Sequence, residues 1–169
     1  MICVETNELL IKPLTRDNID IYLKNKKLLE KKLELNYSNE KLSYEMKKML
    51  AELSQIIELE NDYLWHTNWL IIAKKENIII GGFLFKGSPN KYGEVEVGYS
   101  INERFRNKGY MKNALMAMLK WAFYREYVTT IVAETRKDNI ASQKVLTKVG
   151  MKKYKTTKEH FWYKINKKR

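Results

Sequence analysis

The sequence predicts an α/β protein in which helices cover both faces of one sheet. Short β-branched runs indicate strands, and longer runs with apolar residues three and four apart indicate amphipathic helices. In the centre, these patterns follow one another in the strand–loop–helix–strand–helix order of a crossover unit. At 169 residues and 44% hydrophobic composition, the chain is long enough for one packed core, and we expect a single domain over residues 1–169.

The N-terminal half is expected to hold a strand, two helices and a hairpin. The strand covers Glu8–Thr15 and is stopped by Pro13, and Thr15 or Asp17 caps a helix that reaches about residues 22–27. A longer helix is expected to start at Ser38 or Asn39, with an apolar stripe made of Leu42, Met46, Met49, Leu50, Leu53, Ile56 and Ile57. The runs "NWLIIAKK" and "NIIIGGFLFKG" predict a hairpin that turns at Lys74–Asn77.

The C-terminal half begins with "GEVEVGYSI", whose alternation predicts a strand with two different faces. One face carries Val95, Val97, Tyr99 and Ile101, and the other carries Glu94, Glu96 and Gly98. A helix follows Gly109, and we expect its buried side to consist of Met111, Leu115, Met118, Leu119 and Ala122. A strand in "VTTIVAET", a helix in "NIASQKVLTKVG" that ends at Gly150, and a hairpin in "KYKTTKEHFWYKI" complete the chain.

The formal net charge of +12 favours anionic ligands or partners. The lysines are scattered from Lys12 to Lys168, and no RNP-like motif, zinc knuckle or helix-turn-helix pattern accompanies them, so we expect a solvated basic surface and no specific nucleic acid. No apolar run approaches the roughly eighteen residues of a membrane span. The single cysteine, Cys3, fits a reducing cytoplasm, and neither histidine has a second ligand at metal spacing. We therefore expect a cytoplasmic protein without a metal or a membrane segment.

A basic loop precedes the helix that follows Gly109. Arg104, Arg106 and Lys108 lie directly before a helix N-terminus, which carries unpaired N–H groups and a partial positive charge. Gly109 lets the backbone curl closely around a bound anion. The loop therefore predicts a phosphate-binding site.

Two segments, "VEVGYSINERFRNKGYMKNAL" and "IVAETRKDNIASQKVLTKVGMKKY", resemble the signature segments of the GNAT N-acetyltransferase superfamily. The opening "LLIKPLTRDNID" is similar to that of the branch containing ribosomal-protein alanine and serine acetyltransferases. The resemblance covers about Glu8–Ile165 and is weakest between Leu23 and Leu64. It implies a mixed, mostly antiparallel central sheet of six or seven strands with helices on both faces, and acetyl-CoA as cosubstrate.

The resemblance also implies which residues bind acetyl-CoA. The family motif Gln/Arg-x-x-Gly-x-Gly/Ala falls on Arg106–Met111, where Met111 departs from the usual small residue and its side chain must point into the core. The cofactor-binding residues implied are Tyr99, Ile101, Arg106, Asn107, Lys108, Gly109, Tyr110, Met111, Asn139 and Ser142. A backbone N–H within Val97–Ile101 would stabilise the oxyanion, with Gly98 allowing a bulge. Asn139 is equally suited to cap a helix.

Two residues are candidates for catalysis. An amine attacks a thioester only when unprotonated, and the resemblance favours Glu96 over Glu94 as the general base. The alternative is that both carboxylates face solvent or pair with lysines. Ser142 is the candidate acid, because Leu146 occupies the position of the tyrosine that many members use, although Ser142 also reads as an ordinary first-turn residue.

The resemblance suggests a peptide or protein N-terminus as the acceptor amine. A small amine, such as a polyamine or an aminoglycoside, is the alternative acceptor. Two further alternatives are a GNAT-like protein that binds CoA without catalysis and a basic nucleic-acid or ribosome-binding module. We expect a monomer or a homodimer.

Overall fold

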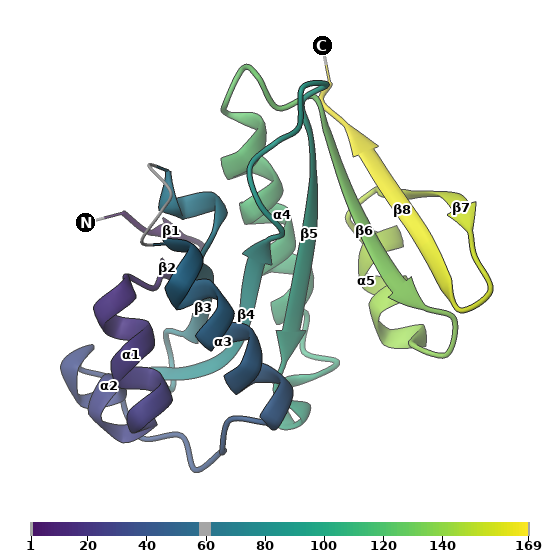
Figure 1. Ribbon diagram of the computed structural model, residues 1–169. Helices are drawn as coiled ribbons and strands as arrows, with labels where there is room; N and C mark the ends of the chain where they lie inside the picture. The colour runs from purple at the N-terminus through teal and green to yellow at the C-terminus, as the bar shows by residue number, and fades with distance from the viewer. Residues whose placement is uncertain (1, 58–61, 169) are drawn as a thin grey trace.

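The computed structural model describes residues 2–57 and 62–168, which form one eight-stranded sheet flanked by helices. The strand order is β1-β2-β3-β4-β5-β6-β8-β7 (Figure 1). The strands are β1 (Val4–Glu5), β2 (Leu9–Pro13), β3 (Asn68–Ala73), β4 (Ile78–Phe85), β5 (Glu94–Ile101), β6 (Thr130–Arg136), β7 (Lys152–Thr156) and β8 (His160–Asn166). All neighbours are antiparallel except β5 and β6. The predicted mixed class is confirmed, and the strand count exceeds seven because β1 pairs with β2.

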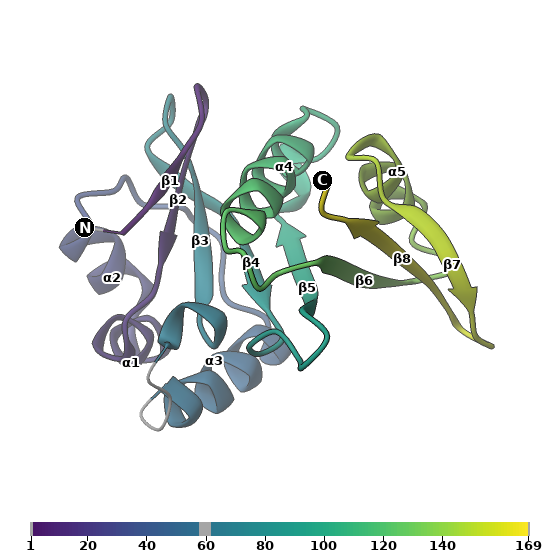
Figure 2. The same ribbon diagram turned by 90° about the horizontal axis from the view of Figure 1, so that it is seen from above.

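Helices lie on both faces of this sheet, as predicted (Figure 2). They are α1 (Arg16–Lys24), α2 (Lys26–Lys32), α3 (Tyr44–Ile57), α4 (Tyr110–Phe123) and α5 (Ile140–Lys148), with short 3-10 turns at Tyr63–Trp65 and Glu103–Phe105. One core joins α1, α2 and α3 to β3 and β4, and the other joins α4 and α5 to strands across the whole sheet. No helix in the described ranges is both long and apolar enough to cross a bilayer.

The first helical segment is broken into two helices. Thr15 caps α1, because its hydroxyl accepts the N–H of Asn18 at 3.4 Å. The chain then becomes extended at Asn25, whose side chain accepts the N–H of Lys27 at 3.0 Å and starts α2. The expected end at residues 22–27 is therefore close to that of α1, but α2 was not predicted.

The long helix begins at Tyr44, so the prediction that Ser38 or Asn39 caps it is wrong. Ser43 accepts the N–H of Met46 at 3.2 Å and takes that role. Ser38 is buried and donates its hydroxyl to Glu30 at 2.8 Å, so a tertiary contact uses the hydroxyl that the local pattern assigned to a cap.

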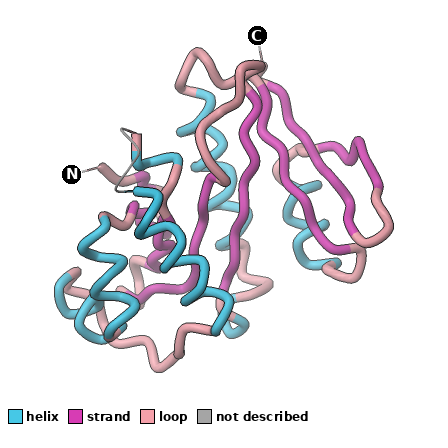
Figure 3. The backbone as a smooth tube through the Cα atoms, in the orientation of Figure 1, coloured by secondary structure: helices cyan, strands magenta, loops and turns pink. Residues whose placement is uncertain are grey.

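Strands β5 and β6 are paired over only a short parallel ladder. Their pairing runs only from Glu94–Thr130 to Glu96–Val132. Beyond this point the two strands diverge, with α4 behind β5 and α5 behind β6 (Figures 1 and 3). The divergence leaves the edge of β5 beyond Glu96 without a ladder partner on its β6 side among the described residues, and this break in the ladder is called the opening.

Candidate active site

Backbone N–H groups of β5 point into this opening. The bonds from Lys86 N–H to Glu96 O and from Asn102 N–H to Ile80 O, at 2.9 and 2.8 Å, show that even-numbered residues of β5 face β4. Because strand residues alternate, the N–H groups of Tyr99 and Ile101 face away from β4. Pairing with β4 is uninterrupted from Val97 to Ile101, so the bulge expected at Gly98 is wrong. The divergence of β6 exposes these donors instead.

Tyr99 spans the opening and contacts the first turn of α5. Its hydroxyl lies 2.9 Å from Ser142 Oγ. Asn139 caps the same helix and accepts the Ser142 N–H at 3.0 Å. Burial and the nearby Tyr163 raise the pKa of Tyr99 to about 12, despite the opposing hydrogen bond to Ser142. The two hydroxyls therefore form a protonated pair at neutral pH.

The loop before α4 places Gly109 at the N-cap with a φ of 84°, and no side chain caps this helix end by a hydrogen bond. Asn107 also has a positive φ of 61°. A Cβ built on Gly109 would meet nothing within 4 Å, so the backbone is open to a ligand here. Met111 is buried and packs in the core on the same side as Leu115, as the helix phase predicts. The side chain of Met111, which is larger than the residue usual in the family motif, therefore does not cover the surface of the loop.

The basic side chains of this loop do not converge on one point. Arg104 forms an ion pair with Glu40 at 3.2 Å, in the segment between α2 and α3. Lys108 lies over the Phe105 ring at 5.2 Å, and Arg106 is half-exposed with Glu103 at 3.9 Å. Arg104 thus holds the loop against another segment, which leaves Arg106 and Lys108 as the cations able to reach an anion at the helix end.

The carboxylates of β5 share one face, and Glu96 is part of a three-residue ionic cluster. Its carboxylate binds the ammonium of Lys86, which also contacts Glu134 of β6 at 3.0 Å. Burial alone would lower the pKa of Lys86, but hydrogen bonds to the two carboxylates raise it. Glu96 therefore pairs with a lysine, which was one of the alternatives to a role as the general base. Glu134 was not predicted as a site residue, although the alternation in "IVAET" places it on the same strand face as Val132.

Comparison with known proteins decides the family. The model of the acetyltransferase (GNAT) domain matches residues 8–152. The chain belongs to the GNAT acetyltransferase family. The uncharacterized N-acetyltransferase YjdG of Bacillus subtilis is 29% identical over 168 residues, which cover 99% of this chain and 100% of that protein.

Solved structures share the fold of this N-acetyltransferase at low identity. The ribosomal-protein-S5-alanine acetyltransferase from Vibrio fischeri superposes with a TM-score of 0.73 at 19% identity, covering 99% of this chain and 97% of that one. The ribosomal L7/L12 α-N-protein acetyltransferase RimL in complex with coenzyme A gives 0.70 at 16% identity, covering 98% of both chains. These likenesses establish the GNAT fold for the described residues.

This acetyltransferase lacks the tyrosine acid that the resemblance associates with the family. Leu146 occupies that position and is fully buried against the core. Two other hydroxyls, those of Tyr99 and Ser142, form a pair at the opening. Tyr99 enters the site from β5, far from Ser142 in sequence, so spacing gave no sign of this contact.

Proposed function

We propose that this acetyltransferase moves the acetyl group of acetyl-CoA to the α-amine of a peptide or protein N-terminus. The observation that carries the choice of acceptor is the ionic cluster at the opening, where Lys86 already bridges Glu96 and Glu134. A polycation would have to displace this lysine, and the net charge of +12 would repel it. Solved structures of the same fold that are named as ribosomal-protein acetyltransferases, one of them an α-N-protein acetyltransferase, support the proposal.

Acetyl-CoA, which GNAT enzymes use as cosubstrate, would bind at the opening between β5 and β6. Residues Arg106–Met111 would hold the pyrophosphate, through backbone N–H groups around Gly109 and the side chains of Arg106 and Lys108. Tyr99 and Ile101 would bind the pantetheine and the acetyl carbonyl from one wall of the opening, and Asn139 and Ser142 from the other.

The side chains at the opening supply the proton transfers. Glu96 would accept a proton from the acceptor, directly or through water, as the amine attacks the thioester carbon. A peptide α-amine of pKa ~8 needs far less help than a lysine or polyamine of pKa ~10. The N–H groups of Tyr99 and Ile101 would stabilise the negative oxygen. As the carbon–sulfur bond breaks, Ser142 would give its proton to the sulfur, and the Tyr99–Ser142 pair would regain one proton from solvent.

The basic C-terminal hairpin, β7–β8, does not favour the nucleic-acid alternative. Three of its lysines lie over rings of the same hairpin, which are the pairs Lys153–Phe161, Lys155–Trp162 and Lys164–Tyr154 at 4.2, 5.4 and 4.9 Å. Bases stack on open aromatic faces. Because lysines cover these faces, the hairpin is not a stacking platform. We also propose that residues 1–169 form a single domain and that the protein is cytoplasmic. The lone Cys3 supports the cytoplasmic location.

The deciding experiment compares acetyl acceptors by release of free CoA thiol. We expect turnover on short peptides with a free N-terminus and none on the same peptides with a blocked N-terminus. Spermidine and an aminoglycoside serve as the competing acceptors. Preference for either of these would overturn the choice of acceptor, whereas transfer to no amine would favour a CoA-binding protein without catalysis.

A further inference from the structure

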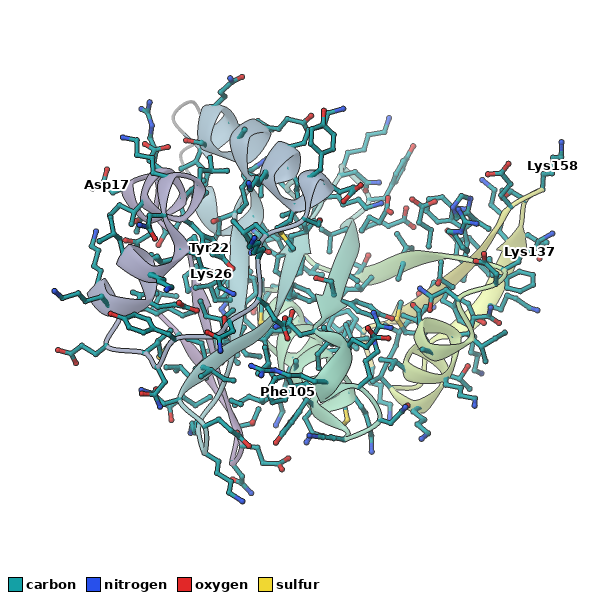
Figure 4. All side chains as sticks on the ribbon, turned by 90° about the horizontal axis from the view of Figure 1, so that it is seen from below. Asp17, Tyr22, Lys26, Phe105, Lys137 and Lys158 are labelled. Atoms are coloured by element: carbon teal, nitrogen blue, oxygen red, sulfur yellow. The ribbon has the colours of Figure 1, made fainter. Side chains whose placement is uncertain are left out.

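A cavity of about 330 Å³ lies on the α1–α3 side of the sheet, next to the proposed active site. Its floor is formed by β3, β4 and β5, and its walls by α1, the start of α2 and the segment before α3. Ser100 and Ile101 of β5 line it, so the cavity touches the strand whose N–H groups face the opening. Figure 4 shows Tyr22 and Lys26 projecting toward this region from the first two helices.

Two deeply buried polar side chains line the cavity without a hydrogen-bond partner in the part of the chain that the structure describes. Asn68 is only 3% exposed, and Tyr22 is only 5% exposed. Neither the Asn68 amide nor the Tyr22 hydroxyl bonds to another described residue. Burial, together with Glu30 and Glu40, raises the pKa of Tyr22, so its hydroxyl stays protonated. The amide and the hydroxyl are not among the fully enclosed polar atoms and both residues line the cavity, so a ligand in the cavity can bond to them.

Gly82 brings the Asn68 amide close to β5. A Cβ at Gly82 would lie 2.8 Å from Asn68 Oδ1, so the amide rests over this glycine. Gly82 pairs with Ser100, and Leu84, which pairs with Asn68, pairs with Gly98. Because neighbouring strands are about 4.8 Å apart, the amide lies about one strand spacing from β5, on its β4 side.

The carboxylates that line the cavity already have basic partners. Its two carboxylates, Glu40 and Glu103, are paired with Arg104 and Arg106 at 3.2 and 3.9 Å. Lys26 donates to Ser38 and, at 2.8 Å, to the backbone carbonyl of Glu40. The wall thus offers a polycation no unpaired carboxylate among the described residues.

We propose that the cavity holds the second residue of the acceptor peptide, with the Asn68 amide accepting from the backbone N–H of that residue and donating to its backbone C=O. An asparagine amide has a donor and an acceptor, as a peptide group does, whereas a protonated polyamine has donors only. The Tyr22 hydroxyl serves the same chain as a further donor. This inference rests on the proposed function and makes Asn68 a determinant of acceptor specificity.

The test uses a tripeptide amide with a free α-amine and its analogue in which an ester oxygen replaces the first peptide N–H. With saturating acetyl-CoA, we expect the wild-type kcat/KM to fall about tenfold or more on the ester. Asn68→Ala is expected to lose about as much on the peptide and to treat the two acceptors alike, once their chemical reactivity is corrected for. Gly82→Ala should do the same, because its Cβ displaces the amide.

Asn18→Ala is the matched control, since Asn18 is buried at 8% exposure and lies outside the cavity. It should keep the wild-type preference, and thermal melting of each variant checks its fold. If Asn68→Ala does not fold, Gly82→Ala and Tyr22→Phe carry the test. A preference unchanged in the folded variants, or absent from the wild type, overturns the inference alone. A wild type that acetylates no peptide overturns the proposed function and the inference with it.

Discussion

Gly109 has a backbone conformation that side chains with a Cβ rarely adopt, and it lies at the open N-terminus of α4. Gly109→Val is expected to abolish CoA binding while leaving the protein folded. Valine strains the backbone by about 1–3 kcal/mol and places a branched side chain over the N–H groups. The measurement is thermal stabilisation by CoA, which for the wild type should reach about 2.7 kcal/mol at one hundred times the dissociation constant.

Gly150→Val controls for backbone strain in this experiment. Gly150 also has a positive φ, of 89°, and its Cβ would meet only Ile165 Cδ1 at 3.8 Å, beyond the far end of α5. This variant should be destabilised yet keep the CoA shift. If Gly109→Val binds CoA as tightly as the wild type does, the placement of the phosphates is wrong. A wild-type protein that is not stabilised by millimolar CoA would contradict this placement too.

The raised pKa of Tyr99 predicts a loss of stability in alkali. Its pKa rises from 10.0 to about 12 in the folded protein, mainly through burial. Between these values the unfolded chain loses the proton and the folded protein keeps it, so increasing pH favours unfolding. Relative to Tyr99→Phe, the wild type should lose about 1 kcal/mol of unfolding free energy between about pH 9 and about pH 11. Urea denaturation measures both, and a difference independent of pH would contradict the burial of this hydroxyl.

At the scale of elements, side chains join β4, β5 and β6 near the point where the parallel ladder stops. The parallel pairing stops at Glu96, and Lys86 then bridges Glu96 to Glu134 across the beginning of the opening. The cluster is partly exposed, with Glu96 at 24%, so an incoming amine can compete with Lys86 for the carboxylate. The proposed base, Glu96, therefore lies at the residue where the pairing of β5 with β6 ends.

Glu96→Gln is expected to lower kcat by about 10²–10⁴-fold near neutral pH, with CoA affinity unchanged. The loss should shrink at high pH, because the acceptor amine then deprotonates unaided. Glu94→Gln is the matched control on the same strand face and should stay near wild type. Full activity of Glu96→Gln at neutral pH, or loss of its CoA binding, would show that another group takes the proton.

At the scale of the whole molecule, the sheet separates two cores. Leu50 of α3 belongs to the core that supports the cavity, and Leu115 of α4 belongs to the core behind the phosphate loop. Each is fully buried. The two binding regions are therefore supported from opposite faces of the same strands.

Leu50→Ala is expected to cost about 2–5 kcal/mol of unfolding free energy, because it opens a void beneath α3. Below its melting temperature, the variant should still be stabilised by CoA as the wild type is, because Leu50 does not contribute to the core behind the phosphate loop. Leu28→Ala, at an exposed leucine, should change stability by about 0.5 kcal/mol or less. Loss of CoA binding in folded Leu50→Ala would show that the two faces are coupled.

Local patterns in the sequence were sufficient for most of the fold. Alternation in "GEVEVGYSI" predicted that Glu94 and Glu96 share a face, and helix phase predicted that Met111 is buried. Such patterns report which side of an element meets the core, and each can be read within a few residues. The start of α3 was mispredicted because Ser38, a good cap by type, is buried against Glu30.

The sequence by itself determined the fold class, the family resemblance and the turn at Gly109. Each of these is read from patterns among residues that lie close together in the sequence. Only the tertiary structure decided the contacts between distant segments. These are the Tyr99–Ser142 pair, the bridge from Lys86 to Glu134, the pairing of Arg104 with Glu40, and the meeting of Tyr22 with Asn68 in one cavity. Their partners lie far apart along the chain, and strand order, register and the divergence of β5 from β6 bring them together.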